Sequence, residues 1–170
     1  MNTNNFKKVR VLAIAPNKEG FGFALMRDTD TLLDWGTRSA GKGDKNANTL
    51  AKVKDLIIRL QPDMLVIPDV WEKGSQRGER IKRLTRQAAD YARQKKLKVK
   101  KTGQGLVNQF FFAGAKGTKY DRALKISNRF PDELEDLLPP KRLVGMDENH
   151  QMPVFDAVAI ATAYLFLKWN

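Results

Sequence analysis

The sequence predicts a mixed α/β domain, in which a five-stranded sheet is covered by helices on both faces. Three short apolar runs separated by polar turns come first, which indicates an antiparallel meander. A segment with helical period follows, and two further strand-like runs then alternate with helices. Strand–helix units after a meander give a mixed sheet. With 170 residues, 42% of them hydrophobic, and no internal repeat, the chain fits a single domain over residues 1–170.

The first half of the chain supplies the meander, one helix and a fourth strand. We expect the meander strands at 9–15, 21–27 and 31–36. In residues 47–60 the apolar side chains recur at helical spacing, and Pro62 ends that helix. The run DMLVIPD, residues 63–69, is compact and apolar, as a buried strand requires.

The second half alternates helices with one more strand. A basic helix is expected at 78–96, and the alternating LKVKKT at 97–102 predicts the fifth strand. Thr118 has the position of an N-cap, with Asp121 three residues later, so a helix should run from there to about residue 130. Three prolines mark a loop, at positions 131, 139 and 140. The last helix, 153–168, is apolar nearly all round and should be largely buried.

The expected topology brings distant residues to one edge of the sheet. A right-handed crossover places strand 63–69 beside strand 9–15. Residues near 15, residues 68–69 and the start of the last helix should then converge at the strand ends. A candidate site is expected at this edge.

The charge of the chain favours a polyanionic partner. The net charge is +12, and residues 73–101 alone hold 12 lysines and arginines against two acids, a net charge of +10. Such a concentration favours contacts with a nucleic-acid backbone, although a solvated helix face would look similar. Lys119, Trp71 and the basic segment supply the candidate DNA-binding residues, although Lys119 could equally be a surface lysine and Trp71 could serve in packing. The candidates in the basic segment are Lys73, Arg77, Arg80, Lys82 and Arg83.

Four acids are candidates for a metal site at the same edge: Asp69, Asp147, Glu148 and Asp156. Clustered carboxylates that hold two Mg²⁺ or Mn²⁺ ions support phosphodiester hydrolysis. Each acid also has a simpler interpretation. Asp69 could close a turn, Asp147 and Glu148 could belong to a flexible loop, and Asp156 could complement the dipole of the last helix.

Four stretches together resemble the RuvC-like Holliday-junction resolvases of the RNase H-like superfamily: VLAIAPNKEGFGFAL, PDMLVIPDVWEKGSQR, GTKYDRALKISNRF and DENHQMPVFDAVAIATAYL. The resemblance covers nearly the whole chain in order and implies an RNase H-like fold. It implies that Asp156 is the last metal-binding acid and Lys119 a DNA-contacting lysine. Asp147 or Glu148 would replace the upstream acid, since Pro153 occupies its usual place. Ala15 and Pro68 stand where the family has acids, with Asp69 next to Pro68.

The resemblance implies a homodimeric protein that binds branched DNA, with a magnesium- or manganese-dependent endonuclease site in its parent form. Catalytic positions would be Ala15, Asp69, Glu148, Asp156 and Lys119, and the loss of an acid at Ala15 should impair cleavage. One alternative is a non-catalytic DNA- or RNA-binding module on a degenerate fold, and another is an assembly protein with a basic face.

The composition bears on the chemistry and the cellular location that we expect for the chain. It contains no cysteine, which excludes disulfides, zinc–thiolate clusters and thiol nucleophiles. The polar start, MNTNNFKK, does not resemble a signal peptide, and no apolar stretch is long enough to span a bilayer. We therefore expect a cytoplasmic protein without a membrane partner.

Overall fold

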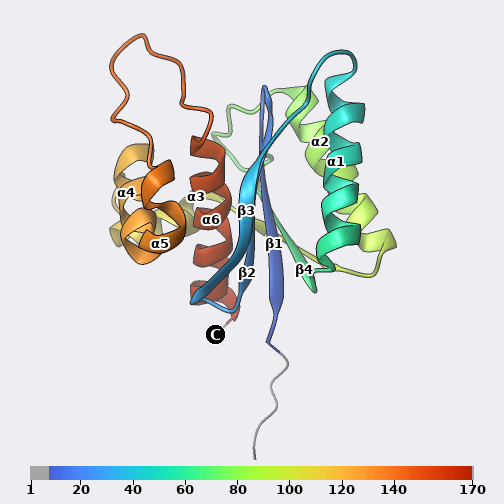
Figure 1. The fold of residues 1–170 in the computed structure, drawn as a ribbon, viewed down its shortest axis with the longest axis horizontal. Helices are drawn as coiled ribbons and strands as arrows, with labels where there is room; N and C mark the ends of the chain where they lie inside the picture. Colours follow the sequence, from blue (N-terminus) through green and yellow to red (C-terminus); the bar gives the residue numbers. More distant parts are fainter. Residues whose placement is uncertain (1–7, 170) are drawn as a thin grey trace, which may run out of the picture.

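The computed structural model describes residues 8–169, which form a five-stranded sheet in the order β3-β2-β1-β4-β5 (Figure 1). β1 pairs with β2, and β2 with β3, in antiparallel fashion, whereas β4 is parallel to both β1 and β5. The mixed sheet and the place of the fourth strand beside the first are as predicted. The strands are β1 (Arg10–Asn17), β2 (Gly20–Arg27), β3 (Thr31–Ser39), β4 (Met64–Pro68) and β5 (Lys98–Thr102).

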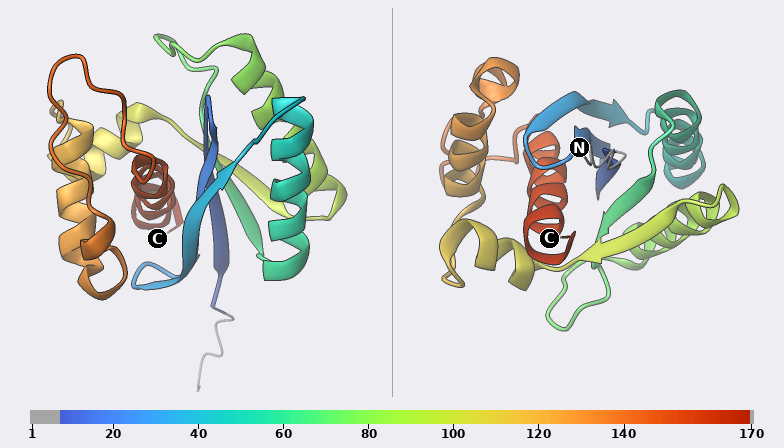
Figure 2. Two further views of the ribbon diagram at one scale, coloured as in Figure 1. Left: turned by 45° about the horizontal axis from the view of Figure 1, so that its top comes forward. Right: turned by 90° about the horizontal axis from the view of Figure 1, so that it is seen from below.

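Helices cover both faces of the sheet (Figure 2). One face packs against α1 (Lys45–Leu60) and α2 (Glu79–Gln94), and the other packs against α6 (Met152–Tyr164). α3 (Gln104–Phe112) and α4 (Lys119–Arg129) lie on the far side of α6. The short elements are α5 (Pro131–Leu134), the 3₁₀ turn η1 (Glu135–Leu137) and the π turn η2 (Leu165–Trp169). Each face of the sheet thus has its own hydrophobic core.

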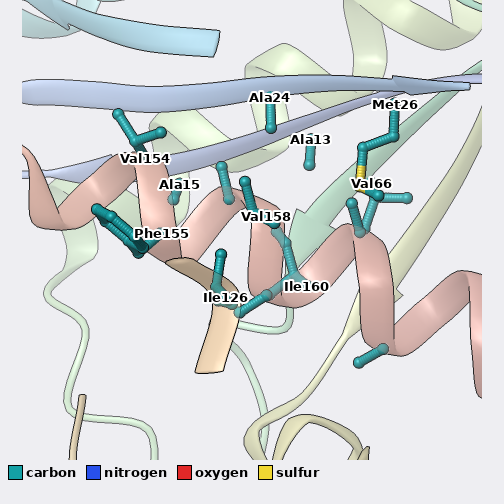
Figure 3. Close-up of a cluster of buried hydrophobic side chains, with 14 of the residues drawn as sticks. Ala13, Ala15, Ala24, Met26, Val66, Ile126, Val154, Phe155, Val158 and Ile160 are labelled. Atoms are coloured by element: carbon teal, nitrogen blue, oxygen red, sulfur yellow. The ribbon is translucent and has the colours of Figure 1, made fainter. Parts of the chain in front are cut away.

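β1 and β2 present small residues to α6, so the helix approaches the sheet closely. Ala13, Ala15 and Ala24 all lie in the core on this side (Figure 3). A Cβ atom added at Gly22, which pairs with Ala15, would lie 2.2 Å from the backbone of Pro153. This close approach fixes the first turn of α6 against the end of β1, where the candidate site was predicted.

α6 is the most buried helix, as its apolar sequence predicts. Every residue from Met152 to Tyr164 is buried except Asp156, which is partly exposed. The helix begins at Met152, one residue earlier than predicted, so Asp156 lies in its second turn and not in its first. Among the described residues, neither this 13-residue helix nor any other is long and apolar enough to cross a membrane.

The structure corrects the prediction between the fifth strand and the candidate site. The sequence pattern does not predict α3, yet Gln104–Phe112 is helical and buries Val107 and Phe111. Pro131 does not belong to a loop but opens the short helix α5, because proline is tolerated in the first turn of a helix. α5 packs against α4, which carries Lys119, whereas α3 packs against α6.

Candidate functional site

A cavity of about 310 Å³ opens where β4 ends. One side consists of the segment 68–77, and the other consists of residues from α3, α4 and α6. Asp69, Lys119, Arg122 and Asp156 all line it. The structure therefore brings together four of the predicted site residues at the predicted edge of the sheet: Asp69, Arg77, Lys119 and Asp156.

Asp156 is held by two cations from α4. Its Oδ1 accepts from Arg122 Nη2 at 3.0 Å, and its Oδ2 accepts from Lys119 Nζ at 3.3 Å. The Arg122 side chain is only 7% exposed and that of Asp156 only 16%, so their ion pair is shielded from solvent. Both carboxylate oxygens of the acid that α6 brings to the site are thus engaged within the protein.

Lys119 joins a second acid to this network. Its Nζ also donates to Glu148 Oε2 at 3.1 Å, in the loop that precedes α6. The Glu148 side chain is 35% exposed, so this outer ion pair is in contact with solvent. Asp147 is exposed beside it and lines an adjoining groove rather than the cavity with Asp69. The two loop acids therefore lie at the outer rim of the site.

The first turn of α4 is built to hold Lys119 in this place. The Thr118 hydroxyl accepts from the Asp121 backbone N–H at 3.0 Å, and the Thr118 N–H donates to the Asp121 carboxylate at 3.4 Å. This capping box confirms the predicted helix start. Hydrogen bonding of the Asp121 carboxylate to the Thr118 side chain and, second, to the Thr118 backbone N–H holds the pKa of Asp121 below its usual range.

The central strands contribute no carboxylate. Ala15 is 6% exposed and its methyl group belongs to the core beneath α6 (Figure 3). Pro68 is the last residue of β4, where it pairs with Thr102. Asp69 follows in the turn, and its Oδ1 accepts from the Trp71 backbone N–H at 3.2 Å. The remaining acid of this strand thus caps a turn.

These residues do not fit the pair of Mg²⁺ or Mn²⁺ ions that the family resemblance implies. Asp156 already has two cationic partners, Asp69 caps a turn, and Ala15 offers only a methyl group. Within residues 8–169, no group of three or more acidic or histidine side chains is arranged to hold a metal ion. The guanidinium and ammonium groups neutralise the Asp156 carboxylate instead.

Two of the predicted DNA-binding arginines also fix the segment after β4. Arg77 Nη1 donates to the Pro16 carbonyl at the end of β1, at 3.2 Å. Arg80 Nη1 donates to Asn46 Oδ1 on α1 at 2.9 Å. Arg77 and Arg80 thus anchor the segment to neighbouring elements.

The other predicted cations of the basic segment are less constrained. Lys82 Nζ lies 3.8 Å from Glu79 Oε1. Lys73 and Arg83 are exposed and have no ion-pair partner among the described residues. These two side chains therefore face solvent and are available to an external anion.

A larger groove of about 690 Å³ runs from the β1–β2 turn past this segment to the loop before α6. Figure 1 shows the β1–β2 turn and the loop before α6 at the same end of the sheet. Cations from separate elements line the groove: Lys18, Arg38, Arg77, Lys119 and Arg142. Glu19, Asp147, Glu148 and Asp156 line it as well, so five cations and four acids share the groove.

Trp71 lies apart from this groove. Its ring packs against the core between the sheet and helices α1 and α2, and Lys101 Nζ and Arg86 lie over it. The structure therefore separates Trp71 from Lys119 and Asp156, although the sequence analysis grouped it with the same DNA-binding residues.

Arg122 is the site residue that the sequence analysis missed. In the sequence it belongs to a polar helix, where an arginine usually faces solvent. Its position three residues after Lys119, on the same helical face, was the available signal. Its burial depends on Asp156, which lies 34 residues away in sequence.

No protein-family model matches the sequence, and no curated protein does so either. Solved structures do match. Thermus thermophilus RuvC superposes with a TM-score of 0.68 at 15% identity, over 92% of this chain and 93% of that one. The same protein in complex with a Holliday junction substrate gives 0.67 at 16% identity, over 93% of each chain. The yeast mitochondrial Holliday junction resolvase gives 0.64 at 10% identity, over 93% of this chain and 78% of that one.

The chain has the RuvC-like, RNase H-like fold. This confirms the fold that the four sequence stretches predicted. Because the identities are so low, the likeness establishes architecture alone, and function has to be argued from the residues of this chain.

Proposed function

We propose that this protein binds branched DNA in the basic groove beside α4 and α6, and that with Ala15 and Pro68 in place it does not cleave that DNA. The observation that carries the proposal is the network of Lys119, Arg122 and Asp156, in which cations satisfy the acid. Because Asp156 is already paired and the groove is lined by cations without an ion-pair partner among the described residues, such as Lys18 and Arg142, it suits a phosphate backbone better than a metal ion.

Branched DNA is the substrate class that the fold favours. Thermus thermophilus RuvC and the fowlpox virus resolvase, the latter with a TM-score of 0.54 at 11% identity, have both been solved with Holliday junction DNA. In this chain, Lys18, Arg77 and Arg142 come from three different segments of the same groove. Cations spread over separate segments can contact more than one arm of a junction.

The loss of cleavage follows from the missing carboxylates. Activation of water and stabilisation of the leaving oxygen in phosphodiester hydrolysis need acids that hold metal ions close together. Ala15 and Pro68 supply none, and Asp156 is already paired. A deficit of about 4 kcal/mol in transition-state stabilisation corresponds to about a thousandfold loss of rate.

The proposal is tested by measuring binding and cleavage of a synthetic four-way junction together. We expect the unmodified chain to bind the junction more tightly than a matched duplex, and to leave it intact with Mg²⁺ or Mn²⁺. Two variants test whether added carboxylates at the ends of β1 and β4 are enough for cleavage: Ala15→Asp alone, and Ala15→Asp with Pro68→Glu. Prompt metal-dependent cleavage by the unmodified chain would overturn the non-catalytic part. Equal affinity for junction and duplex would overturn the branched-DNA part.

A four-way junction has two-fold symmetry, so we also propose that two copies of the chain bind one junction as a homodimer. Light scattering of the free protein and of its junction complex measures the number of copies in each. A strict one-to-one complex at saturating protein would contradict the dimer.

Competition with a matched RNA junction distinguishes DNA from RNA as the preferred partner.

A further inference from the structure

A second basic pocket lies on the opposite face of the sheet from the candidate site. It has a volume of about 340 Å³ and is lined by Ile67, Trp71, Arg86, Ala89, Arg93 and Lys101. These residues come from β4 and the turn after it, from α2 and from β5. Three of the six are cations and none is an acid, so the pocket has an apolar floor and a positive rim.

The cations around Trp71 are not neutralised within the protein. Lys101 Nζ lies 4.7 Å from the centre of the indole ring, and the Arg86 guanidinium carbon lies 5.9 Å from it. Within residues 8–169, neither has a carboxylate partner, whereas Arg93 pairs with Asp90 at 3.3 Å.

The acids that neighbour Trp71 in sequence are engaged elsewhere. Asp69 accepts from the Trp71 backbone N–H at 3.2 Å. Glu72 accepts from the Gln104 backbone N–H at 3.0 Å, at the start of α3. Neither carboxylate is therefore directed at the cations of the pocket.

The indole N–H of Trp71 lacks an acceptor. Nε1 is enclosed and has no hydrogen-bond partner among the described residues. A buried donor without a partner is unfavourable and is unusual in a folded protein. Arg86 and Lys101, whose cationic groups lie over the ring, are themselves exposed.

We propose that this pocket binds a phosphate group. A tetrahedral anion with several acceptor oxygens satisfies two unpaired cations and one N–H donor at the same time. The phosphate belongs either to a nucleic-acid backbone or to a free nucleotide. The pocket is separate from the junction groove, so this inference does not depend on the proposed function.

β5 provides a matched control, because its side chains alternate between the faces of the sheet. Lys101 lines the pocket, whereas the next residue along, Thr102, donates to the Ile160 carbonyl of α6 on the other face. Lys100 is exposed on that same other face and does not line the pocket. Lys100→Gln therefore removes an equal charge from the same strand without changing the pocket.

The test follows the indole N–H resonance of Trp71, assigned by its loss in Trp71→Phe, while ligand is added to the full chain. The probes are inorganic phosphate, adenosine monophosphate and a short single-stranded oligonucleotide. We expect a saturable shift. Lys101→Gln and Arg86→Gln should each weaken binding about tenfold, and Lys100→Gln should leave it unchanged.

The three probes distinguish the source of the phosphate. Saturation by inorganic phosphate or the nucleotide identifies a free ligand, whereas saturation by the oligonucleotide alone identifies a backbone phosphate. No shift with any probe would overturn the proposal, and so would equal losses of affinity in Lys100→Gln and Lys101→Gln. Junction binding in the groove beside Lys119 is measured separately, so either proposal can fail without the other.

Discussion

The candidate site and the Trp71 pocket each contain a lysine and an arginine, but these cations pair with a carboxylate in the site and lie over an aromatic ring in the pocket. In the site, Lys119 and Arg122 neutralise Asp156. In the pocket, Arg86 and Lys101 lie over an indole ring and have no acid beside them among the described residues. The first set of charges is satisfied internally, while the second still requires an anion from outside.

This difference shows how the fold balances the charge of Asp156 with cations of its own. A carboxylate that enters an apolar helix is costly unless it is paired. α6 contains only one such residue, Asp156, and the buried Arg122 provides the pairing. Asp156 is therefore balanced by Lys119 and Arg122, and the exposed cations without an ion-pair partner among the described residues are available to an external anion.

The largest expected effect comes from removing Asp156. Asp156→Ala leaves the buried Arg122 guanidinium without its partner, so the free energy of unfolding should fall by about 3 kcal/mol. Denaturant unfolding measures this change.

Glu148→Gln is the matched control for Asp156→Ala. It breaks the other ion pair of Lys119, which is in contact with solvent, and should change the free energy of unfolding by less than about 0.5 kcal/mol. Joint replacement of Arg122 by Met and Asp156 by Leu should recover most of the loss. Equal effects of the two single variants would mean that the network is not a buried structural ion pair.

A smaller effect is expected from the solvent-facing cations of the basic segment. Lys73 and Arg83 have no ion-pair partner among the described residues, so they are free to bind phosphates. In Lys73→Gln with Arg83→Gln, the slope of log affinity for junction DNA against log salt should become shallower. The expected change is about 0.9 for each phosphate that the variant no longer neutralises. Salt titrations of binding measure the slope.

Lys54→Gln on α1 is the control for this double variant, because Lys54 lies over the Tyr91 ring and away from the junction groove. Its slope should equal that of the unmodified chain. A double variant with an unchanged slope would show that the exposed cations of the basic segment do not reach the DNA. Lys119 and Arg77 in the groove would then be the remaining candidates.

The sequence predicted the five strands and the place of the fourth beside the first, because strand alternation and right-handed crossovers are local or general rules. It did not predict α3, since three consecutive phenylalanines give no amphipathic period and the helix ends at Ala113 with a positive φ of 51°. It also did not predict Arg122, because its burial depends on a contact between two helices. Long-range pairing of charges is not encoded in any local pattern.

The smallest expected loss of stability, apart from that of the Glu148→Gln control, comes from the start of α4, which positions Lys119. Thr118→Ala removes the N-cap and should lower the free energy of unfolding by about 1 kcal/mol near neutral pH, whereas Thr118→Ser should retain it. Part of this effect depends on pH. The pKa of Asp121 is lowered in the folded state by hydrogen bonds from Thr118, so its stabilising contribution is present above the unfolded pKa and lost as pH falls through the lowered value.

The difference in stability between the unmodified chain and Thr118→Ala should therefore shrink as pH falls into the acid range. What remains is the hydrogen bond from the Asp121 amide to the Thr118 hydroxyl, which does not titrate. Unfolding of both chains across this pH range measures the difference, and Asp121→Asn should abolish its pH dependence. A difference that stays constant with pH would mean that the Thr118 side chain does not stabilise the ionised Asp121 carboxylate, and that its role in the cap is to accept from the Asp121 amide.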